Sequence, residues 1–162
     1  MIIHVKNKST LIIDDFKFKC SIGKNGLSSN KKEGDLTTPK GLFSLKKLYF
    51  RKDRVGLPKC NIDKKIIEKN MAWCDDASHN KYNEEIQIYT KNYKERLYRA
   101  DNKYNYIITI SYNYKKIPNK GSAIFIHLTD DYKPTAGCIA IKNKDFEILL
   151  KLIDKKTKIK IG

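Results

Sequence analysis

Residues 121–141 read GSAIFIHLTDDYKPTAGCIAI and hold two apolar runs separated by a polar turn. The first run, over 122–128, is nearly continuous and ends at His127. A continuous apolar run of this length is typical of a central strand that is buried on both faces. After a turn closed by Pro134, Cys138 follows Gly137 and opens the second run, which predicts another short strand over 138–141. The segment therefore predicts two buried strands, with His127 at the end of one and Cys138 at the start of the next.

His127 and Cys138 form a candidate catalytic pair. If the two strands are neighbours, the imidazole and the thiol come within hydrogen-bond reach, and the imidazole can take the thiol proton to make a nucleophilic thiolate. Gly137 allows close backbone approach, so the amides of Gly137 and Cys138 are candidate donors to a developing oxyanion. Thr135 can orient the turn or donate a hydrogen bond. The alternative is a buried cysteine beside a core histidine, and the residues alone leave both interpretations open.

The rest of the chain predicts a mainly β protein with few helices. Residues 24–40 form a long polar loop, a kind of segment that is often functional. Helical spacing is found over 62–69, a single helical turn is expected over 95–99, and a helix face over 146–153 follows Asn143 as the N-cap. Apolar alternation and β-branched or aromatic content predict strands over 2–5, 11–13, 16–20, 42–50, 84–89, 104–114 and 157–161.

Length and charge limit the classes of protein to consider. The 162 residues, taken as one domain over 1–162, carry a net charge of +16. The charge indicates either attraction to an anionic polymer or a lysine-rich composition without a binding role. Only four of the cations are arginine, so specific nucleic-acid recognition is not expected. No apolar run approaches the roughly 20 residues that span a bilayer, and no signal peptide follows Met1, which predicts a cytoplasmic protein on sequence alone.

Several other polar residues are candidates for substrate binding. Asp75 and Asp76 beside Trp73 can hold the loop backbone or contact a substrate. With His79 they match no standard metal-ligand spacing, so neither a metal nor a cofactor is expected. Tyr82 and Asn83 can line a cleft or brace a turn. The candidate substrate-binding set is Asp75, Asp76, Tyr82, Asn83 and Thr135. The four cysteines contain no Cys-x-x-Cys pair, and three of them, Cys20, Cys60 and Cys74, are expected to be inert.

Thr135-Ala136-Gly137-Cys138, with His127 upstream, resembles the active-site signature of the YkuD-like L,D-transpeptidase catalytic-domain family. In that signature a histidine precedes Ser/Thr-x-Gly-Cys. Thr38-Pro39-Lys40-Gly41-Leu42-Phe43 is similar to the family's Thr-Pro-x-Gly-x-Phe. Further pieces resemble the short, signal-less branch of the family and keep its order along the chain, at 32–35, 73–76, 82–83, 95–99, 121–125 and 134–140.

The resemblance implies a β-sandwich with a few short helices, including one near the C-terminus. It implies acyl transfer on peptidoglycan stem peptides, with Cys138 as nucleophile, His127 as general base and acid, and Gly137 as a backbone oxyanion donor. A thioester at the diaminopimelate L-centre would form with release of D-Ala, and a second stem's amine would then complete a 3–3 cross-link. The resemblance further implies carbapenem acylation of the cysteine and a site in the bacterial envelope or periplasm. We expect the protein to be a monomer.

Three departures from the family pattern shape these expectations. Ala136 stands where many members have a second histidine, and the gap from His127 to Cys138 is shorter than in the best-known members. The arginine that often follows the cysteine is absent, so another cation, such as Lys24 or Lys133, would have to recognise the substrate carboxylate. Two alternatives remain open. One is an L,D-carboxypeptidase or amidase that uses water as acceptor, and the other is a non-catalytic module that binds an anionic polymer.

Overall fold

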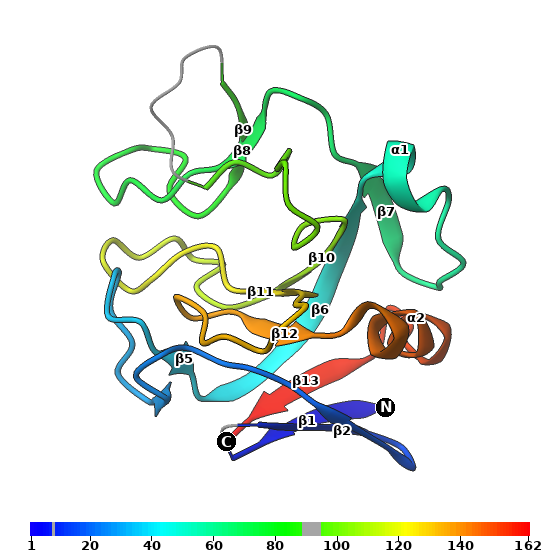
Figure 1. Cartoon of the computed structure of the whole chain (residues 1–162). Helices are drawn as coiled ribbons and strands as arrows, with labels where there is room; N and C mark the ends of the chain where they lie inside the picture. The colour runs from blue at the N-terminus through cyan, green and yellow to red at the C-terminus, as the bar shows by residue number, and fades with distance from the viewer. Residues whose placement is uncertain (8, 89–94) are drawn as a thin grey trace.

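The secondary structure is mainly β, as the apolar alternation predicts. The computed structural model describes residues 1–7, 9–88 and 95–162 (Figure 1). In chain order the elements are β1 (Ile2–Lys6), β2 (Thr10–Ile13), β3 (Phe16–Lys19), β4 (Leu27–Ser28), β5 (Thr38–Pro39), β6 (Gly41–Phe50), α1 (Lys52–Val55), β7 (Asp63–Ile66), β8 (Met71–Trp73), β9 (Glu85–Gln87), β10 (Tyr106–Ile110), β11 (Phe125–Leu128), β12 (Ile139–Ile141), α2 (Asn143–Leu152) and β13 (Lys158–Ile161).

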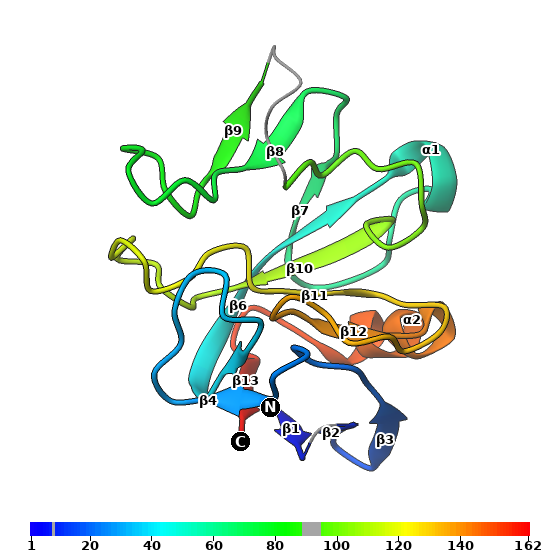
Figure 2. The same ribbon diagram turned by 60° about the vertical axis from the view of Figure 1, so that its left-hand side comes forward.

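One strongly bent sheet carries the fold. Its strand order is β12-β11-β10-β6-β13-β1-β2-β3, and β7 pairs with β6 outside this path. The long strand β6 pairs antiparallel with both β10 and β13, so it joins the two halves of the sheet. Figure 2 shows β1, β2 and β3 on the opposite side of the molecule's core from β10. Beyond β3, Ser21 and Ala140 exchange backbone hydrogen bonds of 2.8 and 2.9 Å, which brings the ends of the sheet together as in a nearly closed barrel.

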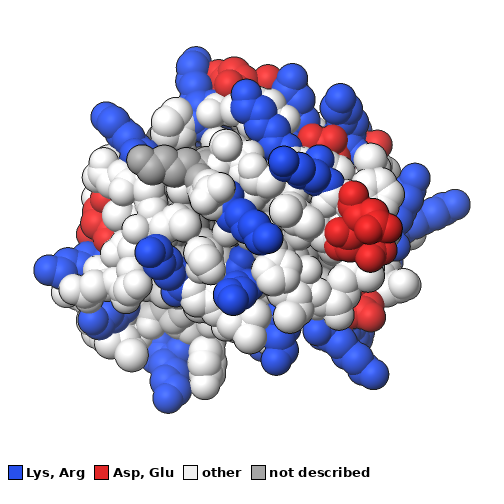
Figure 3. Space-filling view, turned by 90° about the horizontal axis from the view of Figure 1, so that it is seen from below, with Lys and Arg blue, Asp and Glu red and all other residues white. Residues whose placement is uncertain are grey.

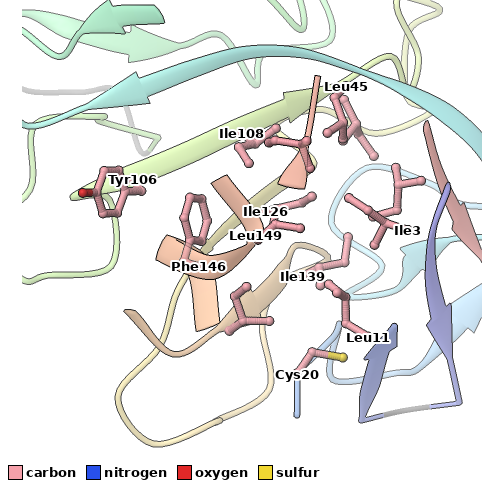
Figure 4. Packing of buried hydrophobic residues seen from close by; sticks show 14 of the residues in the cluster. Ile3, Leu11, Cys20, Leu45, Tyr106, Ile108, Ile126, Ile139, Phe146 and Leu149 are labelled. Carbon is pink, nitrogen blue, oxygen red and sulfur yellow. The ribbon is translucent and has the colours of Figure 1, made fainter. Parts of the chain in front are cut away.

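The main core lies between the halves of this sheet and α2. Figure 4 shows Ile3 and Leu11 on one side and Ile126 and Ile139 on the other, and all four are fully buried. The ring of Phe146 on α2 stacks on another ring, that of Tyr106, with centroids 5.3 Å apart. Each fully buried side chain of this kind stabilises the fold by about 1.5–3 kcal/mol. The helix therefore fills the interior of the bent sheet.

A second, smaller core lies on the other face of β10 and β11. Ile108 belongs to the main core, whereas its neighbour Ile107 belongs to the second cluster, because successive side chains of a strand point to opposite faces. Phe125 and Cys138 are also members of the second cluster. Burial on both faces explains why the sequence of these strands is apolar almost without interruption, and it places Cys138 at the edge of a packed apolar region.

Three local expectations from the sequence are wrong. Residues 62–69 do not form a helix, because Asp63–Ile66 is an exposed strand that pairs in parallel with β6. Residues 95–99 do not form a helical turn; Arg96 instead makes an isolated β-bridge with Ala72. Lys142, not Asn143, is the N-cap of α2, and the Asn143 side chain donates to Glu147. In the first two cases backbone pairing with a distant strand outweighs the local pattern.

Other boundaries differ from the expectations in smaller ways. The expected strand over 104–114 is confirmed as β10 but spans only Tyr106–Ile110, and the expected strand over 84–89 is β9, with Tyr89 outside the described residues. The polar loop over 24–40 contains the two-residue strands β4 and β5, which pair with each other. In the described part of the chain, no helix combines the length and the apolar character needed to cross a bilayer.

Candidate active site

The sheet carries His127 and Cys138 on neighbouring segments that border the same cavity. Strand β11 pairs in parallel with β12, and His127 lies opposite Ala140 in this register. Cys138 directly precedes β12, so the expected neighbouring of the two strands is confirmed. Both residues line one cavity of about 410 Å³. A cavity wall that carries a thiol and an imidazole on adjacent strands has the components of a nucleophile–base pair.

The Cys138 thiol is buried, with 8 % of the residue exposed. It donates a hydrogen bond to the Ala123 carbonyl at 3.1 Å and accepts one from the Phe125 amide at 3.4 Å. Burial, followed by the nearby Glu95 carboxylate, raises the pKa of Cys138 to about 12. The thiol therefore keeps its proton at neutral pH and needs a base to become a nucleophile.

His127 is in the protonation state that such a base requires. Its Nδ1 lies 2.8 Å from the Leu128 carbonyl oxygen. Because that oxygen can only accept, the neutral ring carries its proton on Nδ1 and leaves the lone pair on Nε2. Burial lowers the pKa of His127 to about 4, and the ring of Tyr104 packs edge-on against the imidazole at 5.3 Å. The imidazole is thus neutral at physiological pH and held in one orientation.

The turn before Cys138 is tied down from several directions. Thr135 Oγ1 accepts from the Gly137 amide at 3.1 Å and donates to the Cys138 carbonyl at 2.7 Å. The Thr38 hydroxyl of β5 donates to the Gly137 carbonyl at 2.8 Å. A Cβ on Gly137 would lie 2.8 Å from the Thr37 carbonyl oxygen, at a φ of +148°, so the close approach requires glycine.

The two backbone amides expected at an oxyanion site differ in their partners. The Gly137 amide is engaged with Thr135 Oγ1. For the Cys138 amide, no hydrogen-bond acceptor is found in the portion of the chain that the structure describes. A free amide next to a nucleophile is the arrangement that stabilises a developing negative charge on the attacked carbonyl.

The residues expected to bind substrate fall into two groups. Asp75 and Thr135 line the cavity, whereas Asp76, Tyr82 and Asn83 are not among its lining residues. Asp76 accepts from the amide and hydroxyl of Ser78 in an exposed turn. The Tyr82 hydroxyl donates to Glu33, itself a lining residue, and accepts from the Gly121 amide, so it braces the cavity wall.

Asn83 supports the segment that contacts the thiol. Its Oδ1 accepts from Trp73 Nε1 at 2.9 Å and from the Ala123 amide at 3.1 Å. Ala123 has a φ of +53°, which is unusual for a residue with a Cβ, and its carbonyl accepts the thiol hydrogen bond. Asn83 therefore holds the strained backbone of Ala123, whose carbonyl contacts the Cys138 thiol.

Several charged residues of the cavity were missed by the sequence analysis. Of the two lysines considered, Lys133 lines the cavity but is exposed and pairs with Asp131 at 3.0 Å, and Lys24 is not a lining residue. Nothing in a chain with 34 lysines and arginines singles out Lys31, which lines the cavity and is buried. The other lining residues not anticipated include Glu95, Arg99, Lys103 and Tyr104. Glu95 is the first residue of the family-like piece over 95–99, but the expected helical turn did not place it at the cavity.

The sequence matches one protein-family model over nearly its whole length. The family model described as YkuD, L,D-transpeptidase catalytic domain, matches residues 2–161. The chain belongs to the YkuD family of L,D-transpeptidase catalytic domains. The resemblance expected from the two short motifs is confirmed over nearly the whole chain, and this membership supports an L,D-transpeptidase type of function in general terms.

Solved structures confirm the YkuD-like β fold. The chain is similar to Bd1075 from Bdellovibrio bacteriovorus, with a TM-score of 0.52 and 16 % sequence identity over 99 % of this chain and 47 % of that one. It is also similar to the helical cell shape determining protein Pgp2 from Campylobacter jejuni, with a TM-score of 0.52 and 19 % identity over 99 % of this chain and 46 % of that one. The chain thus spans about half the length of each. No curated protein sequence matches it.

Proposed function

We propose that this YkuD-family chain is an L,D-transpeptidase that transfers peptidoglycan tetrapeptide stems through a thioester on Cys138. The observation that supports this most directly is the placement of Cys138 and His127 on one cavity wall by adjacent parallel strands. A protonated thiol and an imidazole with a free Nε2 lone pair are the two groups that general-base activation of a nucleophile needs.

In the acylation half of the reaction, His127 Nε2 takes the Cys138 proton as the sulfur attacks the carbonyl of the diaminopimelate L-centre. The thiol must first release its hydrogen bond to the Ala123 carbonyl. The Cys138 amide stabilises the oxyanion, and the Gly137 amide joins it if its bond to Thr135 Oγ1 opens. The carbon–nitrogen bond to D-Ala then breaks, and His127 returns the proton to the leaving amine.

In the second half, the side-chain amine of another stem attacks the thioester. His127 takes a proton from that amine, the carbon–sulfur bond breaks, and the thiol of Cys138 regains its proton. The product is a 3–3 cross-link, and the protein returns to its starting state. Because the resting thiol is protonated, the proton leaves the sulfur during the attack. The resting site does not hold a thiolate–imidazolium pair.

The test is incubation with purified tetrapeptide muropeptides, followed by mass spectrometry of the products. We expect cross-linked dimers that have lost one D-Ala, and none in the Cys138→Ala variant. A matched control is Cys60→Ala, which removes a free cysteine that does not line the cavity and should leave activity unchanged. If tripeptide stems form without dimers, the protein is an L,D-carboxypeptidase or amidase and the proposed transfer is wrong. Product formation that survives Cys138→Ala would contradict the proposed nucleophile.

A further inference from the structure

Lys31 is a buried cation next to the turn that carries the nucleophile. Its side chain is 4 % exposed and lines the same cavity as Cys138. The Lys31 Nζ lies 3.4 Å from the position that a Cβ on Gly137 would occupy, and its Cε lies 2.9 Å from the corresponding position on Gly121. Two glycines therefore leave the space through which this side chain reaches the site.

The ammonium group of Lys31 is held in place but not fully used. It donates to Asp35 Oδ1 at 2.7 Å and to the Lys32 carbonyl at 3.3 Å. Asp35 is itself fixed by the Thr37 amide and hydroxyl, each at 2.9 Å. A lysine ammonium has three N–H donors, and these two acceptors are the ones found for it within the described ranges. One donor is therefore left on a preorganised cation that borders the cavity.

Lys31 differs from the other cations around the cavity. Arg99 is partly exposed, and Lys103 and Lys133 are exposed. Among the lining cations in the described ranges, only Lys31 is buried. A hydrogen bond from a buried, preorganised cation to an anion is stronger than one at an exposed site, because the local dielectric is low.

We propose that Lys31 binds the terminal carboxylate of the amino acid that leaves when Cys138 is acylated. The inference rests on the proposed function, because that reaction places the scissile carbonyl at the Cys138 sulfur. Standard bond lengths put the carboxylate of the leaving residue roughly 4 Å from the scissile carbon. The Lys31 ammonium borders the same cavity and reaches Gly137, the residue directly before Cys138. Lys31 thus supplies, from the loop over 24–40, the cation that the sequence lacks after Cys138.

The first test measures the anion site without any peptidoglycan substrate. Iodoacetate and iodoacetamide alkylate a thiol by the same displacement and differ mainly in charge, so the ratio of their rates at Cys138 does not depend on the thiolate fraction. We expect Lys31→Met to lower the iodoacetate-to-iodoacetamide ratio by about tenfold, the value of one hydrogen bond between charged groups. The ratio at Cys60, which does not line the cavity, is the internal standard in the same digest.

The matched control is Lys32→Met, which removes one exposed positive charge from the same loop without altering the cavity lining. If Lys31→Met alone fails to fold, the double variant Lys31→Met/Asp35→Asn removes both charges of the buried pair and should show the same loss. A ratio at Cys138 that stays unchanged in folded Lys31 variants, or that falls equally in Lys32→Met, would overturn the proposal.

The second test identifies the carboxylate. Donor stems ending in D-Ala are compared with stems ending in D-Ala amide, using wild type and Lys31→Met. If Lys31 binds this carboxylate, each change alone lowers kcat/KM by about tenfold, and both together lower it little further. If the two losses in kcat/KM multiply instead, Lys31 does not bind this carboxylate and has another role. Absence of turnover with any stem, combined with the expected alkylation ratios, would contradict the proposed function but leave the anion site at Lys31 in place.

Discussion

At neutral pH the Cys138 thiol keeps its proton and the His127 ring is neutral, with no proton on Nε2. Burial is the cause, because it disfavours the charged form of each group. The Glu95 carboxylate acts in the same direction on the thiol. The site therefore rests as a neutral thiol beside a neutral imidazole. This state slows oxidation and alkylation of the cysteine, because both rates follow the thiolate fraction.

Alkylation of Cys138 by iodoacetamide should rise continuously with pH through pH 9. The physical reason is that the pKa of this thiol is raised to about 12, so the thiolate fraction increases with every step in pH across this range. The measurement is the rate of adduct formation at Cys138, read by peptide mass spectrometry between pH 6 and 9. A plateau reached below pH 8 would instead show a thiolate–imidazolium pair in the resting protein.

His127 should make the free energy of unfolding depend on pH in the acid range. Its pKa is about 4 in the folded chain, below the ordinary histidine value of 6.5, so the unfolded chain binds more protons between these two pH values. The contribution is fully present above pH 6.5 and is lost as the pH falls toward 4, with an upper limit of about 3 kcal/mol. Urea denaturation at pH 4.5 and 7 should show this loss in wild type and a smaller one in His127→Phe.

The matched control for this pH dependence is His4→Gln in β1, which should show the same loss as wild type. Equal losses in wild type and His127→Phe would mean that other groups, and not the buried imidazole, produce the acid sensitivity.

At the scale of elements, β5 connects the loop over 24–40 to the turn before Cys138. The hydroxyl of Thr38 accepts from the Gly23 amide and donates to the Gly137 carbonyl, both at 2.8 Å, and Thr38 is fully buried. The threonine of the Thr-Pro-x-Gly-x-Phe motif therefore joins three distant segments. Its part in the family motif is explained by this bridge, which holds the backbone directly before Cys138.

Thr38→Val should destabilise the fold by about 2 kcal/mol or more, because a side chain of the same shape without the hydroxyl leaves two buried backbone groups unsatisfied. The same variant should slow acylation of Cys138, since Gly137 loses its anchor. Urea denaturation gives the stability and intact mass gives the acylation rate. Thr10→Val is the control, because Thr10 lies in β2 and does not line the cavity. Wild-type stability in Thr38→Val would show that the bridge has no energetic role.

The elements show which parts of the molecule the sequence could predict. Strands β6, β10, β11 and β12 were predictable because their alternating or continuous apolar runs report burial directly. Strand β7 was not, because it is exposed on all four residues and exists through pairing with β6, which no local pattern reveals. The pair His127 and Cys138 could be found from one short segment. Lys31 could not, because its burial depends on glycines about 90 and 106 residues away.

At the scale of the whole molecule, the segment after β3 closes the sheet against β12. Ser21 and Ala140 each donate to the other's carbonyl, and Thr135 donates to the Ile22 carbonyl in the same seam. Closure of this kind removes exposed strand edges and joins the N-terminal strands to β12, the strand that follows Cys138. The position of Cys138 is therefore set by contacts from both ends of the chain.

Hydrogen exchange should report this closure. We expect the amides of Ser21 and Ala140 to exchange as slowly as those in the middle of β10, because they open only with the sheet as a whole. Amides of β7, an exposed strand outside the main path, should exchange faster. Fast exchange at Ser21 and Ala140 together with slow exchange in β10 would show that the seam opens on its own and that the barrel is not closed in solution.

The charge of the whole molecule is distributed differently on its surface and in its cavity. Figure 3 shows lysine and arginine side chains spread across the face that bears β1, β2 and β13 in place of one continuous band. The cavity, in contrast, is lined by both acidic and basic side chains. Among them, Glu95 raises the pKa of Cys138 and Lys31 lowers it. Substrate recognition is thus expected from the arrangement of charges in the cavity and not from the net charge of +16.

The most direct test of the central claim is the intact mass of the protein after brief exposure to a carbapenem or to a tetrapeptide donor. We expect one covalent adduct on Cys138, absent in Cys138→Ala and formed at least about a hundredfold more slowly in His127→Ala, because that variant lacks the general base. Cys60→Ala should form the adduct at the wild-type rate. No adduct on Cys138 with either acylating agent, or equal rates with and without His127, would contradict the assignment of this pair as the catalytic centre.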